Sequence, residues 1–158
     1  MILPRLRIRR IEANRYALRL PDEEREVLLS LMPQLRDLLT MDDPLTRRIF
    51  PTAYAQDHER DREYQQLVHD DLLESRLAAI EVFEVTLRSD ELSTEQLDAW
   101  MTALNSLRLV LGTRLDVGED PPELDPDDPE APMYAVYEYL AWMLEQAIRA
   151  RSEDLQKP

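Results

Sequence analysis

The first twenty residues alternate apolar and polar side chains with a period of two. Leu6 and Ile8 lie between arginines, and after a polar break at 12–14 the alternation resumes at Tyr16. A period of two places apolar residues on one face of a strand, and the break supplies a turn. The pattern predicts a β-hairpin over residues 1–21, whose polar face carries five arginines: Arg5, Arg7, Arg9, Arg15 and Arg19. Because a lone hairpin is marginal in water, we expect its apolar face to pack on the rest of the chain.

Residues 22–115 change to a helical period. Five leucines and one methionine within residues 28–39 lie on one face of a helix, and this spacing continues through Pro33. Either one helix kinks at Pro33 or two helices meet there. A long helix is predicted from about Asp57 to Leu87, and Ser93 with Gln96 forms a capping box that begins the next helix. The apolar stripe of the long helix consists of Leu73, Leu77, Ile80, Phe83 and Leu87.

Residues 116–131 interrupt the helical pattern with acids and prolines, and residues 132–151 resume it as a final helix. That helix has a second apolar face containing Tyr139 and Trp142. These rings are either an interface, which predicts a possible homodimer, or core residues beneath the hairpin. The patterns together predict a mainly α single domain over residues 1–158, a small four-to-five-helix bundle with an N-terminal two-stranded β-hairpin.

Charge is distributed unevenly along the chain. The 158 residues carry a net charge of −14, made of +5 over residues 1–20 and −19 over the remainder. Because residues 21–158 are so acidic, they repel phosphate, which makes direct nucleic-acid binding the least favoured role. Like charges crowded on one hairpin face repel one another, so an anionic group should lie opposite. The candidates are the chain's own acidic loop, a protein partner and a nucleic-acid backbone, in that order.

Composition excludes several kinds of chemistry. The chain has no cysteine and two glycines, which removes thiolate catalysis, Cys-ligated metals and glycine-rich phosphate loops. No apolar run approaches the ~18 residues of a membrane span, and no signal-peptide pattern is present. We therefore expect no cofactor, no metal, no membrane association and a cytoplasmic location.

One enzymatic alternative remains open. His69 and Asp70 are adjacent, and His58 lies eleven residues earlier. Imidazole and carboxylate together can hold a divalent ion that activates water, as in metal-dependent hydrolases of the HD type. A solvated pair on a charged helix explains the same residues, because so short a motif often occurs by chance.

Four segments carry a resemblance to a known family: residues 47–54 (RRIFPTAY), 70–81 (DDLLESRLAAIE), 99–115 (AWMTALNSLRLVLGTRL) and 134–146 (YAVYEYLAWMLEQ). On these segments the chain resembles an actinobacterial domain-of-unknown-function family, the one catalogued as number two thousand and seventeen in that series. The resemblance implies a cytosolic protein without established catalytic residues, and a role in oxidation-linked transcriptional regulation has been suggested within the family. Thiol-based sensing cannot apply to this chain, because it has no cysteine.

From these observations we expect a non-enzymatic regulatory or adaptor protein that acts through protein contacts. The resemblance adds a possible transcription-associated partner, such as polymerase or a sigma factor. The arginine face of the hairpin and the pair Tyr139 and Trp142 are the expected partner-binding residues.

Overall fold

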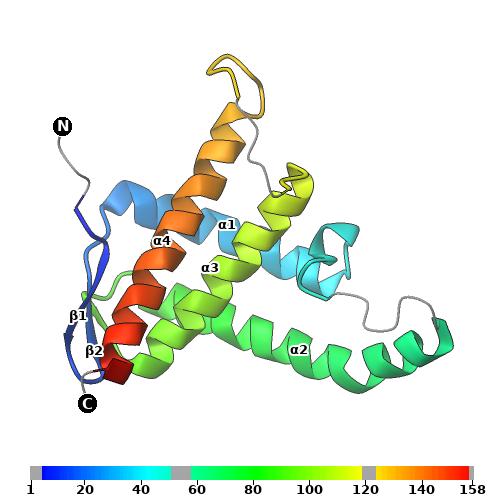
Figure 1. The fold of residues 1–158 in the computed structure, drawn as a ribbon, viewed down its shortest axis with the longest axis horizontal. Helices are drawn as coiled ribbons and strands as arrows, with labels where there is room; N and C mark the ends of the chain where they lie inside the picture. The colour runs from blue at the N-terminus through cyan, green and yellow to red at the C-terminus, as the bar shows by residue number, and fades with distance from the viewer. Residues whose placement is uncertain (1–4, 51–57, 119–123, 157–158) are drawn as a thin grey trace.

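The computed structural model describes residues 5–50, 58–118 and 124–156, which form a helical bundle with a small sheet at one end (Figure 1). The bundle contains the long helices α1 (Asp22–Thr40), α2 (His58–Thr86), α3 (Thr94–Arg114) and α4 (Ala131–Gln156). A short 3-10 helix, η1 (Pro44–Thr46), follows α1. The mainly α fold with an N-terminal hairpin is therefore confirmed. In the described part of the chain, none of these helices combines the length and the apolarity needed to cross a membrane.

The hairpin consists of β1 (Ile8–Glu12) and β2 (Arg15–Leu18), paired antiparallel with Ile8 opposite Leu18. Asn14 adopts a left-handed φ of 61° in the turn, a conformation that asparagine tolerates better than most residues. A third strand, β3 (Glu91–Leu92), pairs with β2 on the other side. The sequence analysis missed β3, because two residues between helices are too short to show a period. Its presence makes β2 the central strand of the sheet.

The first helix, α1, runs unbroken from Asp22 to Thr40 through Pro33. Of the two predicted alternatives, the single helix is therefore the one observed. Pro33 lies on the exposed side of α1, while Leu28, Met32 and Leu35 on the other side are fully buried. Three acids in the first turn of α1 interact favourably with the positive end of its helix dipole.

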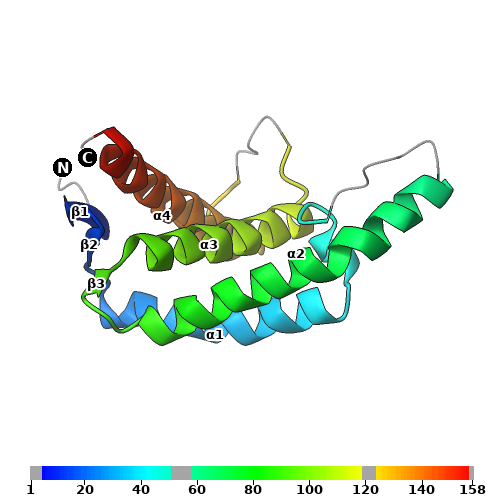
Figure 2. The ribbon, with the colours of Figure 1, turned by 90° about the horizontal axis from the view of Figure 1, so that it is seen from below.

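The centre of the bundle is α3, which packs between α2 and α4 (Figure 2). Its start is fixed by the predicted capping box, in which Ser93 and Gln96 bond reciprocally to each other's backbone N–H groups. Trp100 on α3 is fully buried, with its ring centre 4.3 Å from that of Phe83 on α2. The Trp100 indole N–H donates to the Thr86 hydroxyl at 2.7 Å, so this large side chain has no unsatisfied polar atom.

The predicted stripe of α2 is buried only in its second half. Ile80, Phe83 and Leu87 are at most 1% exposed, whereas Leu73 and Leu77 are half-buried. The last two face a groove between α1 and α2 rather than a closed core. Helical spacing predicts which residues share a face, but the neighbouring helix decides how deeply that face is covered.

Candidate functional site

Arg7 fastens the arm, residues 5–20, to the helices. Its Nε donates to both carboxylate oxygens of Glu24 on α1, at 3.0 and 3.2 Å, and its Nη2 donates to Glu24 Oε2 at 2.8 Å. The guanidinium carbon also lies 5.3 Å from the centre of the Trp142 ring on α4. A planar guanidinium can bond a carboxylate and lie over an aromatic ring at once, so this side chain joins the arm to two helices.

Glu24 is shared by Arg7 and Tyr139. The Tyr139 hydroxyl donates to Glu24 Oε1 at 2.6 Å, and the side chains of Arg7 and Glu24 are only 17% and 23% exposed. Partial burial opposes ionisation of Glu24, but hydrogen bonds from Arg7 and Tyr139 outweigh it and hold the pKa of Glu24 below its ordinary 4.5. Burial raises the pKa of Tyr139, and its bond to Glu24 raises it further, so the hydroxyl remains a donor. Arg7, Glu24, Tyr139 and Trp142, here called the Arg7 cluster, thus form a fixed joint at neutral pH.

Gln146 of α4 supports the arm at its backbone. Its side-chain Oε1 accepts hydrogen bonds from the N–H groups of Arg7 at 2.6 Å and Ile8 at 3.2 Å. Ile8 is the first residue of β1 and Arg7 precedes it, and β1 is an edge strand with β2 on one side only. Free N–H groups on a sheet edge are a template for pairing with another chain, and a buried amide that satisfies two of them removes part of that template.

The other arginines of the arm divide into paired and exposed ones. Arg10 Nε lies 2.8 Å from Asp154 Oδ1 on α4, and this hydrogen bond lowers the pKa of Asp154. Arg15 pairs with Glu91 of β3 at 2.8 Å and also with Glu12. Within residues 5–50, 58–118 and 124–156, three arm arginines are exposed and make no ion pair: Arg5, Arg9 and Arg19.

The carboxylates that the arm engages are not those first expected. They belong to α1, β1, β3 and the C-terminal end of α4, whereas the acidic loop precedes the N-terminal end of α4. Figure 1 shows residues 124–130 at the end of α4 farthest from the sheet. Arg7 meets α4 at Trp142, which is eleven residues or about 16 Å of helix from Ala131, so the described part of the loop lies well away from that arginine.

Tyr139 and Trp142 lie beneath the arm, which is one of the two placements predicted for them. Both are partly buried against the core, and their ring centres lie 6.1 Å apart. Tyr139 engages Glu24, and Trp142 engages Arg7. The homodimer through these rings stays a prediction.

A groove of about 380 Å³ lies between β1 and α4 and is here called the arm groove. Leu6, Ile8 and Trp142 contribute apolar surface to it, and Arg9 lies on its lining. Leu6 is 56% exposed, so its side chain is accessible from solvent. The arm groove therefore combines accessible apolar surface with Arg9, which makes no ion pair with the residues that the structure describes.

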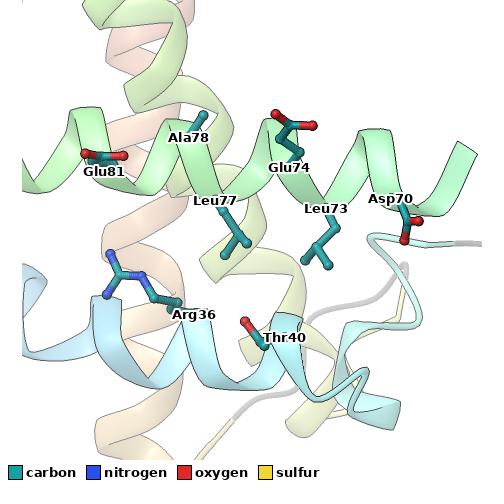
Figure 3. A pocket seen from close by; sticks show the side chains of 8 residues that line it. All are labelled: Arg36, Thr40, Asp70, Leu73, Glu74, Leu77, Ala78 and Glu81. Atoms are coloured by element: carbon teal, nitrogen blue, oxygen red, sulfur yellow. The ribbon is translucent and has the colours of Figure 1, made fainter.

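A second and larger depression, about 820 Å³, separates α1 from α2 and is here called the α1–α2 groove (Figure 3). Leu73 and Leu77 point from α2 towards α1, where Arg36 and Thr40 lie (Figure 3). The remaining lining residues all belong to α2: Asp70, Glu74, Ala78 and Glu81. The groove thus has an apolar part and an acidic part.

The hydrolase alternative stays open, because the side chain of His58 lies outside the described part of the chain. Residues 58 and 69 both belong to α2, and eleven residues of helix span about 16 Å. His69 lies with its ring centre 4.7 Å from that of Phe50, and Asp70 is exposed. Among the residues that the structure describes, no three histidine or acidic side chains come together as metal ligands would.

Sequence reasoning missed Glu24, Gln146 and Asp154, which hold the arm. No local pattern could have identified them, because their partners are 17 or more residues away along the chain. The acidic part of the α1–α2 groove did leave a signal. Its residues recur at helical spacing beside the stripe of Leu73 and Leu77: Asp70, Glu74 and Glu81.

Comparison with known proteins gives a family without a described activity. No curated protein and no solved structure matches the chain. The model of one family, described as a domain of unknown function (DUF2017), matches residues 6–151. That match covers nearly all of the arm and most of the helical bundle, and the chain therefore belongs to the DUF2017 family.

Proposed function

We propose that this protein is a non-enzymatic regulatory or adaptor protein that acts through protein contacts in the cytosol. The arm groove is the observation that supports this most directly, because it offers Leu6 and Arg9 beside the Trp142 ring. The Arg7 cluster and Gln146 already hold the arm in place. A surface that is ordered before binding loses little affinity to ordering on binding.

The lining of the arm groove indicates the chemistry of a partner. Its apolar part suits an apolar side chain, and Arg9 suits a carboxylate. The rest of the charged lining is balanced, with Arg10 and Arg149 beside Glu145 and Glu153. The chain as a whole carries −14, which disfavours a nucleic-acid backbone. These features favour a segment of protein with mixed apolar and acidic side chains.

The family resemblance extends the proposal towards transcription. The resemblance points to a partner such as polymerase or a sigma factor. It does not identify residues of this chain that would contact such a partner. The mechanism proposed for this chain is therefore protein contact without thiol-based redox chemistry, since the chain has no cysteine.

The test compares proteins captured from native lysate by the tagged full chain and by two variants. In the first variant, Leu6→Asp and Arg9→Glu change the arm groove. In the second, Arg114→Glu reverses another exposed arginine, in the last turn of α3. We expect a partner that the unchanged chain and Arg114→Glu retain and the groove variant loses, with all three showing the same circular dichroism. Identical capture by all three chains would contradict the proposal.

A further inference from the structure

The α1–α2 groove has a net negative lining once its internal ion pair is taken into account. Arg36, the single basic residue among the described residues of the lining, pairs through Nη2 with Glu84 Oε1 of α2. The side chains of Asp70, Glu74 and Glu81 make no ion pair or hydrogen bond within the described residues. Three carboxylates therefore face solvent along one side of a groove in which Arg36 is already engaged.

The apolar part of the same groove lies open beside these acids. Leu73 and Leu77 are half-buried, and Figure 3 shows both directed into the space between α1 and α2. Water in contact with these leucines is displaced when another apolar side chain covers them, which stabilises a complex. An occupant with apolar residues on one face and basic residues beside them would satisfy both parts.

The dimensions of the groove indicate the form of that occupant. Its lining on α2 runs from Asp70 to Glu81, which is about 16 Å of helix, or three turns. Neighbouring helices pack with their axes 8–10 Å apart, and side chains at i, i+3, i+4 and i+7 then meet the facing ridge. A helix of about three turns matches a groove bordered by two helices better than an extended strand, which would leave its backbone N–H and C=O groups unpaired.

We propose that the α1–α2 groove binds a basic amphipathic helix of a partner protein. Apolar side chains of that helix cover Leu73 and Leu77, and its lysines or arginines lie against Asp70, Glu74 and Glu81. This inference rests on the proposed function because the occupant is again a protein. It concerns a different surface, and the partner segment is basic rather than acidic. The chain would then join a partner segment with acidic groups, at the arm, to a basic helix on α2.

The experiment uses the full chain and a single reporter. Because the chain has no cysteine, Ala78→Cys creates one attachment point in the groove for an environment-sensitive dye. Ser75→Cys is the matched control, since Ser75 is exposed on α2 outside the lining. The probe is a synthetic helix-forming peptide of about 18 residues, roughly five turns, with leucines at i, i+4, i+7 and i+11 and lysines or arginines elsewhere. A second peptide carries glutamate at every basic position.

We expect a saturable dye response at position 78 with the basic peptide, a much smaller one at position 75, and none with the acidic peptide. Asp70→Lys combined with Glu74→Lys should weaken binding by about tenfold or more, because attraction becomes repulsion at two positions. Asp71→Lys, an exposed neighbour outside the lining, should change affinity by less than about twofold.

Equal weakening by the Asp71→Lys control, or equal dye responses at both positions, would overturn the proposal by showing that bulk charge alone attracts the peptide. A dye response that grows with protein concentration without peptide, together with a dimeric mass by light scattering, would also overturn it by making a second copy the occupant. Failure of the peptide to bind, while the arm-groove variant still loses its partner from lysate, would reject this inference and leave the proposed function standing.

Discussion

Arg7 and Glu24 lie 17 residues apart in the sequence and form an ion pair at 2.8 Å that ties the arm to α1. Glu24 has no other basic partner in the described part of the chain, and its second oxygen accepts the Tyr139 hydroxyl. Arg7, one of the five arginines expected to bind a partner, is therefore engaged within the molecule.

Removal of this carboxylate should destabilise the fold. Glu24→Ala leaves Arg7 partly buried without its counterion, and we expect the free energy of unfolding to fall by about 2 kcal/mol. Tyr139→Phe removes one hydrogen bond to the same carboxylate and should lower it by about 1 kcal/mol. Urea denaturation measures both. Glu23→Ala, an exposed neighbour, should change stability by less than about 0.5 kcal/mol. A loss as large in Glu23→Ala as in Glu24→Ala would contradict the role of the pair.

Stability should fall in acid because of carboxylates whose pKa is lowered by folding. Burial disfavours the charged form of Glu24, but its bonds to Arg7 and Tyr139 prevail and place the pKa below 4.5. The hydrogen bond from Arg10 likewise lowers the pKa of Asp154 from 3.8. A lowered pKa contributes stability that is fully present above the unfolded-state pKa and is lost as pH falls through the folded-state value.

The urea midpoint should therefore be nearly constant from about pH 7 to 5.5 and should fall below about pH 4.5. Glu24→Gln keeps the shape of the side chain but cannot ionise, so its midpoint should be lower at neutral pH and should decline less in acid. Parallel pH curves for Glu24→Gln and the unchanged chain would show that Glu24 does not contribute.

The amide of Gln146 should be needed to keep β1 in place. Gln146→Leu preserves volume but leaves the N–H groups of Arg7 and Ile8 without an acceptor, and a buried unsatisfied donor costs about 1–3 kcal/mol. We expect that loss in urea denaturation, with faster hydrogen exchange at Arg7 and Ile8. Glu145→Ala, at the exposed neighbouring position, should leave exchange of both amides unchanged.

The acidic loop should be dispensable for holding the arm. Asp125→Asn, Asp127→Asn and Asp128→Asn together remove three charges from the described part of the loop but retain its side-chain acceptors. We expect stability within about 0.5 kcal/mol of the unchanged chain at both low and high salt. Asp154→Asn, which weakens the pair with Arg10, should lower it by about 1–2 kcal/mol. A salt-dependent loss in the loop variant would instead connect the loop to the arm.

Metal analysis tests the hydrolase alternative directly. Because residues 58 and 69 are about 16 Å apart along α2, we expect purified protein to contain less than one divalent ion per chain. His69→Ala should leave that content unchanged, and it should lower stability modestly through the lost contact with Phe50. One ion per chain that disappears in His69→Ala would favour the hydrolase instead.

The sequence predicted those features that depend on neighbouring residues. A period of two identified the hairpin, and the Ser93 and Gln96 capping box identified the start of α3 to the residue. The continuation of α1 through Pro33 stayed open, because proline is compatible with both a bend in one helix and the start of another. Local spacing also could not reveal that Leu73 and Leu77 border a groove, since that depends on how far α1 lies from α2.

The carboxylates that pair with the arm arginines were the least predictable feature of the fold. The arm was expected to require anions, and it has them, but Glu24, Glu91 and Asp154 come from three distant elements. A charge count identifies the need for a counterion without indicating its source, because the source is decided by how the bundle packs.

Because β2 is the central strand of the sheet, truncation of the arm and single substitutions in it have different effects on the fold. Tyr16 and Leu18 are completely buried, and β3, which lies between α2 and α3, hydrogen-bonds to the same strand. Truncation of the first twenty residues would therefore uncover the base of the bundle and remove the partner strand of β3, as well as deleting six arginines. A truncated chain would report on a damaged core, whereas single replacements of Arg5, Arg9 or Arg19 leave the sheet whole and isolate the contribution of charge.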